Sequence, residues 1–271
     1  MIELAVTAFL FVMGYMGGGF LLSLILRRND IADIAWGLGF IATAAFLGTK
    51  TGNWHDHTMV VMGLTSLWGL RLAIHIFGRN RKKAEDFRYQ KWREEWGKWW
   101  VLRSLVQVWL LQGVFMWLIS FSTIIAFTAE SGTFPWLNWV GIVVWLIGFY
   151  FEAVGDWQLG QHIRRPENKG VLMTKGLWQY TRHPNYFGEV TQWWGIWLTV
   201  VGLPWSWVAV ISPLTISWLI LKVSGIPMLE KKYQGRTDFE AYAKVTNAFF
   251  PWFPKKRLKN FLSDGRGQAG D

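Results

Sequence analysis

The strongest constraint on this chain is its series of long apolar stretches. A helix needs about 20 consecutive apolar residues to cross the hydrocarbon core of a bilayer. Seven stretches approach that length, at roughly 2–26, 31–49, 58–78, 104–128, 134–157, 184–202 and 204–222. Charged residues make up only 17% of the chain, whereas soluble proteins carry about 25%. The sequence therefore predicts an all-α fold, a polytopic membrane helix bundle of about seven transmembrane helices.

The positions of the basic residues predict how the bundle is oriented. All but two of the 28 lysines and arginines lie in four segments between or after the spans. These basic segments are residues 27–30, 79–103, 158–183 and 222–271. Because basic loops tend to stay on the cytoplasmic side, we expect the N-terminus outside and the C-terminus in the cytoplasm.

Composition excludes several classes of function. The chain has no cysteine, which rules out disulfides, thiolate catalysis and cysteine metal sites. The net charge of +10 lies in loops that would face a membrane surface, so we expect no nucleic-acid partner. The absence of an internal repeat disfavours a transporter. We predict one domain over residues 1–262 and a disordered tail over 263–271.

The basic segment 79–103 also carries tryptophans and carboxylates. Most of it is typical of an interfacial helix, with tryptophans among the lipid headgroups. The cluster "EDFRY", with Glu85, Asp86 and Tyr89, fits this interpretation less well, because carboxylates are disfavoured beside an anionic membrane. Asp33, in the second span, is also costly in lipid. An ion pair of Asp33 with Arg71 and a catalytic role both stay open.

The fifth span ends in a second polar group. Glu152 and Asp156 are four residues apart and share a helix face, and Arg164 and Arg165 follow about two turns later. Such a group suits a ligand that carries hydroxyl or amine groups together with phosphate. The alternative is that the arginines are topology signals only.

The segment "LWQYTRHPNYFGEV", residues 177–190, leads into the sixth span. Pro184 suits the first turn of a helix but not its interior. We therefore expect the helix to begin at Pro184, with Arg182 and His183 just outside it. Asn185 and Glu189 then share one face of the first turns.

The start of this helix is predicted to bind a ligand of mixed character. Free backbone amides there favour an anion such as phosphate or carboxylate, and Arg182 and Lys175 add positive charge. Glu189 is unsuited to phosphate but suits an amide, an amine or a ribose hydroxyl. A single ligand with both kinds of group would satisfy the whole set.

The last polar cluster begins with Lys222 at a span end and includes Tyr242. One interpretation is a C-terminal amphipathic helix packed beneath the bundle. In the other, its tyrosines and lysines close a nucleotide pocket from below.

The segment "GLWQYTRHPNYFGE" resembles the cofactor segment of the steroid 5-alpha-reductase family and of the related C7/C14 sterol reductases. The preceding "DWQLGQHIRRP" looks like the Asp-bearing helix of that family. The resemblance covers about residues 140–254, as a cofactor-binding half, and is greatest to the bacterial branch. It implies a seven-helix reductase of a bacterial inner membrane that binds NADPH on its cytoplasmic side. Such an enzyme reduces a carbon–carbon double bond of a lipophilic substrate, steroid-like or another enone.

The resemblance also implies which residues bind NADPH. By matching position, it assigns cofactor contacts to Asp156, Arg164, Asn185, Tyr186, Glu189, Lys222 and Tyr242. The charge and hydrogen-bonding capacity of neighbouring residues add Arg165, Lys175, Arg182 and His183. The pair of arginines suits the 2′-phosphate of NADPH. The resemblance requires neither a metal nor a flavin.

The catalytic residues of the family are not matched. Its Gln-Glu pair and tyrosine, which polarise the 3-ketone of a steroid, have no counterpart pattern here. Candidate replacements are Asp33, Glu85, Asp86 and Tyr89. Tyr89 is the preferred proton donor, because a phenol stays protonated at neutral pH. In this chemistry, hydride reaches the β-carbon of an enone and a proton reaches the α-carbon.

A second resemblance points to another reaction. "RHPNYFGE" followed by "MLEKKYQGRTDFEAY" also looks like the isoprenylcysteine and phospholipid methyltransferases, where similar segments hold S-adenosylmethionine. Asn185, Glu189 beside Gly188, the seven spans and the arginine pair favour the reductase. The alternative is an S-adenosylmethionine-dependent methyltransferase of a lipid or isoprenoid. A non-enzymatic lipid-binding or transport protein is the third hypothesis.

Overall fold

The computed structural model describes residues 1–81, 85, 87–130 and 134–255. Asp86 and the predicted tail 263–271 lie outside these residues. Within them, all regular structure is helical, which confirms the all-α prediction. The α-helices are α1 (Ile2–Leu26), α2 (Ile31–Thr51), α3 (Asp56–Asn80), α4 (Phe87–Trp96), α5 (Trp100–Arg103), α6 (Leu111–Ile119), α7 (Phe121–Thr128), α8 (Trp136–Arg164), α9 (Pro184–Leu198), α10 (Ile211–Trp218), α11 (Ile226–Lys231) and α12 (Thr237–Val245). Shorter 3₁₀ segments are Gly97–Trp99, Pro166–Asn168, Gly176–Gln179 and Val208–Val210, and π-helical segments are Ser104–Leu110 and Leu219–Val223.

Six helical runs of the described residues are long and apolar enough to cross a membrane, as an integral membrane protein requires. They are Ile2–Leu26, Ile31–Thr51, Asp56–Asn80, Tyr89–Ile119, Trp136–Arg164 and Val208–Lys231. The fourth run differs from the predicted 104–128. It starts at Tyr89 and stops before Ser120, whose ψ of 0° ends α6 and leaves α7 as a separate helix.

The sixth predicted span corresponds to α9, which is only 15 residues long. After Leu198 the chain continues in turns up to the 3₁₀ segment Val208–Val210. A 15-residue helix rises about 22 Å, less than the hydrocarbon thickness of about 30 Å. The total of seven crossings, and with it the side of each terminus, therefore stays a prediction.

The chain divides into two compact units. The first contains Met1–Gly141 and Ile196–Thr215, and the second contains Ile142–Gly195 and Ile216–Asp271. Helices α8, α9 and α10 contribute residues to both units. The stretch 140–254 assigned to the cofactor shares most of its residues with the second unit. The prediction of one domain over 1–262 is not tested by this division.

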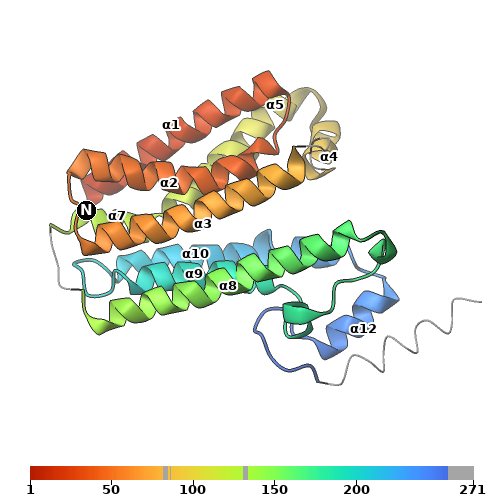
Figure 1. Ribbon diagram of the computed structural model, residues 1–271. Helices are drawn as coiled ribbons and strands as arrows, with labels where there is room; N and C mark the ends of the chain where they lie inside the picture. Colours follow the sequence, from red (N-terminus) through yellow and green to blue (C-terminus); the bar gives the residue numbers. More distant parts are fainter. Residues whose placement is uncertain (82–84, 86, 131–133, 256–271) are drawn as a thin grey trace, which may run out of the picture. The chain divides into compact units, whose positions relative to one another are not determined.

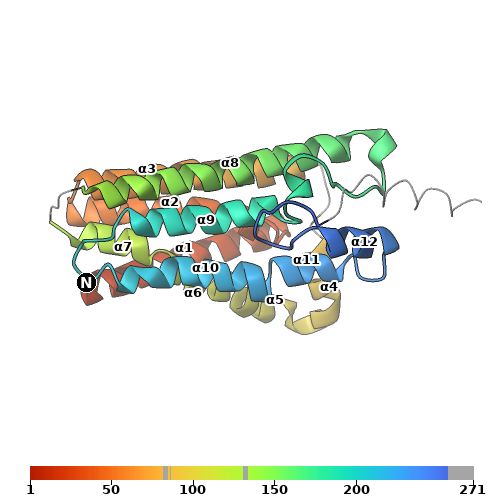
Figure 2. The same ribbon diagram turned by 90° about the horizontal axis from the view of Figure 1, so that it is seen from below.

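The first unit is built on α1, α2 and α3, which run side by side in alternating directions (Figures 1 and 2). Helices α2 and α3 touch backbone to backbone where Gly37 faces Gly69. A Cβ at Gly37 would lie 2.7 Å from the carbonyl oxygen of Gly69. A core cluster of buried side chains, Ala5, Ala8, Ala44, Leu47, Phe121, Ile124 and Phe127, packs α1 and α2 against α7.

The two ends of this unit are held by different polar contacts. At one end the backbone N–H of Asn29 donates to Glu85 Oε1 over 2.6 Å, which joins the first two basic segments. At the other end, Asn53 Nδ2 donates to the carbonyls of Phe127 and Ala129. The first two basic segments therefore share one end of the unit, while the side of the membrane on which that end lies stays a prediction.

In the second unit, α8 and α9 pack closely (Figure 2). A Cβ at Gly148 would lie 2.6 Å from the carbonyl oxygen of Gly188, and one at Gly188 would overlap the backbone nitrogen of Glu152. Only glycine permits this approach, which brings the polar residues of α8 beside the start of α9. The short helices α11 and α12 complete the unit.

Candidate functional site

The candidate cofactor site lies where α9 begins. The helix starts at Pro184, as predicted, and Asn185 occupies its first turn. Asn185 Nδ2 donates to Asp156 Oδ1 over 3.1 Å, so the structure joins two of the predicted cofactor residues. Asn185 Oδ1 is buried and has no hydrogen-bond partner among the described residues. This acceptor is available to a ligand that donates a hydrogen bond.

His183 presents a second unsatisfied atom. Its ring is buried and stacks on Tyr186, with the ring centroids 5.5 Å apart. Nε2 lies 2.9 Å from Glu230 Oε1, while Nδ1 is buried and unpartnered within the described chain. When Nε2 carries the proton toward the carboxylate, Nδ1 of the neutral ring is an acceptor. With the neutral ring in this tautomer, the start of α9 offers two acceptors, at positions 183 and 185.

Arg182 has an internal role in the second unit. Its Nε donates to Glu230 Oε1 over 2.8 Å, and its Nη1 donates to the carbonyls of Ala243 and Thr246 over 3.2 and 2.5 Å. Its backbone N–H donates to the carbonyl of Asn247. These bonds tie the approach to α9 to α11 and to the end of α12.

Tyr242 is also packed inside the unit. Its side chain is buried, and its hydroxyl donates to the carbonyl of Trp178. Burial raises the pKa of this hydroxyl above its ordinary value, so it stays a donor at physiological pH. Trp178 Nε1 in turn donates to the carbonyl of Gly155 on α8. Tyr242 thus holds the segment before α9 against α8.

The remaining predicted cofactor residues differ in exposure. Glu189 and Tyr186 are partly buried on α9. The exposed basic residues are Arg164, Arg165, Lys175 and Lys222. Because their side chains are exposed, they are accessible to a phosphate-bearing ligand.

The sequence pattern predicts a ligand-binding group of Glu152 and Asp156, but it does not single out Gln192, the partner of Glu152. Glu152 is 2% exposed and accepts a 2.5 Å hydrogen bond from Gln192 Nε2. Gln192 follows Asn185 by seven residues, two turns along one helix face, which was a usable signal. Glu230, the shared acceptor of Arg182 and His183, lies in the last polar cluster, for which the sequence leaves both an amphipathic helix and a nucleotide pocket open.

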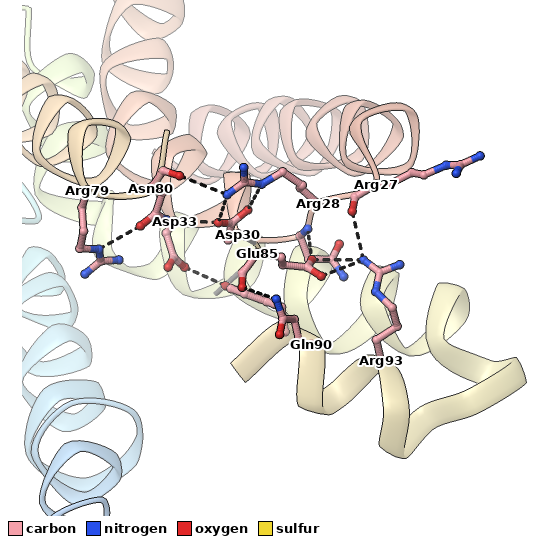
Figure 3. Close-up of polar contacts among 11 residues, drawn as sticks. Arg27, Arg28, Asp30, Asp33, Arg79, Asn80, Glu85, Gln90 and Arg93 are labelled. Atoms are coloured by element: carbon pink, nitrogen blue, oxygen red, sulfur yellow. Dashed lines mark hydrogen bonds and ion pairs between the residues drawn. The ribbon is translucent and has the colours of Figure 1, made fainter. Parts of the chain in front are cut away.

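A separate polar cluster lies at one end of the first unit (Figure 3). Asp30 is buried and receives two hydrogen bonds from Arg28, of 3.0 and 2.7 Å. Asn80 Nδ2, at the end of α3, donates to the same carboxylate over 3.3 Å. The loop between α1 and α2 is thereby fixed to α3.

Glu85 has a similar anchoring position in this cluster. Besides the N–H of Asn29, it receives hydrogen bonds from Arg93 Nη2 to both carboxylate oxygens, each of 3.1 Å (Figure 3). The same Nη2 donates to the carbonyl of Arg27. Arg93 also lies over the ring of Trp100 at 4.2 Å. Glu85 therefore connects the α1–α2 loop to α4.

The structure brings together Tyr89 and Asp33, two of the catalytic candidates. The Tyr89 hydroxyl donates to Asp33 Oδ1 over 2.7 Å, and the Tyr89 side chain is only 3% exposed. The hydrogen bond to the carboxylate fixes the orientation of the phenol. The ion pair of Asp33 with Arg71 stays a prediction.

The two relatives described here match only part of the chain. The protein titled "Uncharacterized protein C594.04c" from Schizosaccharomyces pombe is 23% identical over 189 residues, which are 62% of this chain and 54% of that protein. "Steroid 5-alpha-reductase DET2" from Arabidopsis thaliana is 31% identical over 83 residues, 30% of each chain. The chain thus spans about half of the first relative and under a third of the second. No solved structure matches it.

One protein family matches most of the sequence. Its pattern matches residues 19–246, a range that contains every candidate cofactor and catalytic residue named above. Residues from both compact units fall within the match. On this evidence, the chain belongs to the family described as "Protein of unknown function (DUF1295)".

Proposed function

We propose that this protein is an NADPH-dependent membrane reductase that saturates a carbon–carbon double bond in a lipophilic substrate, steroid-like or another enone. The observation that carries the proposal is the Asp156–Asn185 hydrogen bond at the start of α9, with the free acceptor Asn185 Oδ1 beside it. The similarity to "Steroid 5-alpha-reductase DET2" supports the same reaction class.

The residues at the start of α9 fit the donor groups of NADPH. Asn185 Oδ1 and His183 Nδ1 are buried acceptors, which hydroxyl or amide N–H groups would satisfy. NADPH carries such donors on its ribose rings and its carboxamide, and when bound it supplies a hydride. Asp156 fixes the Asn185 amide so that its oxygen is directed to the ligand and not to Asp156.

The phosphate groups require a different set of residues. Arg182 donates from Nε and Nη1 to Glu230 and to two backbone carbonyls, and its role as an anion ligand stays a prediction. Arg164 and Arg165 are exposed at the end of α8. A pair of guanidinium groups suits the 2′-phosphate that distinguishes NADPH from NADH. Lys175 and Lys222 are further exposed cations for the pyrophosphate.

Tyr89 is the proposed proton donor to the α-carbon of the substrate. Its hydroxyl is held by Asp33 Oδ1, and the residue is 3% exposed. In the proposed step, the Tyr89 oxygen gives up its proton as the double bond is reduced, and a proton from solvent restores it. Glu85 is an anchor for α4 in this proposal, because its carboxylate is already bound by Arg93 and Asn29.

A methyltransferase is the alternative, and one contact favours it. The Arg-His-Pro segment and the "MLEKKY" segment, which hold S-adenosylmethionine in the proteins that they resemble, meet through the Arg182–Glu230 and His183–Glu230 contacts. The substrate would then be a lipid or isoprenoid. S-adenosylmethionine also carries amine and hydroxyl donors.

Calorimetric titration of the detergent-purified protein separates these functions. NADPH, NADH and S-adenosylmethionine are titrated one at a time. The reductase requires saturable binding of NADPH, tighter than that of NADH. Binding of S-adenosylmethionine alone would establish the alternative, and the absence of any binding would leave a lipid-binding or transport protein.

A further inference from the structure

The last described segment of the chain forms an extended hook, residues 246–255, after α12. Its backbone is fixed at several points. Trp252 N–H donates to the carbonyl of Tyr180 over 2.9 Å, and Lys255 N–H donates to the carbonyl of Val245 over 3.0 Å. Thr181 Oγ1 donates to the carbonyls of Ala248 and Phe249. The hook is therefore held to the residues that precede α9.

Although its backbone is fixed, the hook directs large aromatic side chains outward. Phe250, Trp252 and Phe253 are 70%, 70% and 74% exposed. The ring of Phe249 lies 5.6 Å from that of Phe187 on α9. The rings of Phe250 and Phe253 also contact Phe187 and Tyr180, with centroids 6.3 and 5.8 Å apart, but most of their surface stays exposed. Three exposed aromatic side chains within four residues indicate a surface that is covered by something else.

The charge beside these aromatic side chains indicates what covers them. Lys255 is exposed at the end of the hook, and the sequence continues with Lys256, Arg257 and Lys259, beyond the described residues. Tryptophan concentrates at membrane–water interfaces, and basic clusters next to membrane spans bind anionic lipid headgroups. Among the described residues, six helical runs are able to cross a membrane, so the protein is expected to lie in contact with a lipid surface.

We propose that the hook, residues 246–255, binds the headgroup region of an anionic bilayer through Phe250, Trp252 and Phe253, with Lys255 on the lipid phosphates. Because the hook is bonded to Tyr180 and Thr181, the lipid surface also stabilises the segment that leads to His183. A membrane contact thus supports the conformation of the proposed cofactor site.

The absence of cysteine in the chain makes a direct test simple. A single fluorophore is attached at Trp252→Cys in the full-length protein, in nanodiscs of phosphatidylcholine with or without phosphatidylglycerol. The control is the same label at Gln234→Cys, an exposed polar position in the turn after α11. Quenching by a headgroup nitroxide lipid and by aqueous iodide is then measured.

We expect nitroxide quenching at position 252 to be at least about twofold stronger than at position 234, and to increase when phosphatidylglycerol is present. Iodide should show the opposite order. Equal quenching at the two positions, or no effect of the anionic lipid, would overturn the proposal. A label at Phe253→Cys repeats the measurement should Trp252→Cys fold poorly, and no cofactor is needed, so the outcome is independent of the proposed function.

Discussion

The amide nitrogen and the amide oxygen of Asn185 differ in their hydrogen bonding. The nitrogen donates to Asp156, and the oxygen is left buried and unsatisfied by the described residues. A buried acceptor without a partner costs free energy of about 1–3 kcal/mol. A ligand that supplies the missing donor recovers this energy, which gives Asn185 a direct part in affinity.

Replacing Asn185 by alanine should therefore weaken NADPH binding by about tenfold, the effect of roughly 1.4 kcal/mol. The measurement is the dissociation constant from calorimetric titration. Asn53→Ala is the matched control, because Asn53 Nδ2 also donates to backbone carbonyls, those of Phe127 and Ala129, outside the proposed cofactor site. Equal affinity of the Asn185 variant and the parent protein would remove this residue from the site.

The arginine pair predicts a difference between two cofactors. Replacing Arg164 and Arg165 together by alanine should reduce NADPH affinity by about tenfold and leave NADH affinity nearly unchanged, because only NADPH has a 2′-phosphate. Arg103→Ala, another exposed arginine, is the control. A parallel loss for both dinucleotides would argue against the assignment.

Tyr89→Phe tests the proton donor. Removal of the hydroxyl that donates to Asp33 should abolish turnover while the dissociation constant for NADPH stays the same. The readout is NADPH consumption with any enone found by screening the parent protein. Tyr150→Phe, at an exposed position of α8, should retain turnover. A Tyr89→Phe variant with full activity would show that the proton comes from another group.

Among the helices, the close packing of α8 and α9 decides the position of the proposed site. Their backbones touch at Gly148 and Gly188, one turn of α8 before Glu152. Farther along, a Cβ at Gly155 would meet the ring of Pro184 at 3.1 Å. Asp156, the next residue, therefore lies within reach of Asn185. The glycines determine how near the two polar helix faces come.

Gly148→Ala should separate the two helices and lower the melting temperature. The added methyl group would lie 2.6 Å from the carbonyl oxygen of Gly188, and overpacking of this kind costs about 1–3 kcal/mol. The control is Gly160→Ala on the same helix, where no atom lies within 4 Å. That change should raise stability by up to about 1 kcal/mol, because alanine is the better helix former. Thermal melts in detergent that ranked the two variants in the reverse order would contradict this account.

The sequence predicted the helices better than their interruptions. The start of α9 at Pro184 follows from the fixed φ of proline and its missing N–H. The π-helical segment Ser104–Leu110 and the break at Ser120 carry no proline or glycine, so nothing local marked them. The internal role of Arg182 was also not predictable, because its acceptors lie in a distant part of the sequence.

For the molecule as a whole, the number of membrane crossings decides on which side of the membrane each terminus lies. Seven crossings place the two termini on opposite sides of the membrane, whereas six place them on the same side. The end of α9 belongs to the first unit, where Asn138 Nδ2 donates to the carbonyls of Leu198 and Val201. Asn138 is the third residue of α8, so α9 ends beside the start of its antiparallel neighbour.

Single cysteines in this cysteine-free chain can count the crossings. We expect an impermeant maleimide to label Lys50→Cys and Trp207→Cys on intact cells, and Lys169→Cys only after permeabilisation. All three positions are exposed. If Trp207→Cys and Lys169→Cys were labelled from the same side, α9 would not cross, and the predicted orientation of the C-terminus would be wrong.

The contacts of Arg182 can form only after a much later part of the chain has been synthesised. Its partners Glu230, Ala243 and Thr246 are 48, 61 and 64 residues further along the chain. The ribosome must therefore translate as far as Glu230 before the guanidinium can pair with a carboxylate, and as far as Thr246 before all three hydrogen bonds can form. A product that terminates before residue 230 lacks all three acceptors, however well its first helices have inserted.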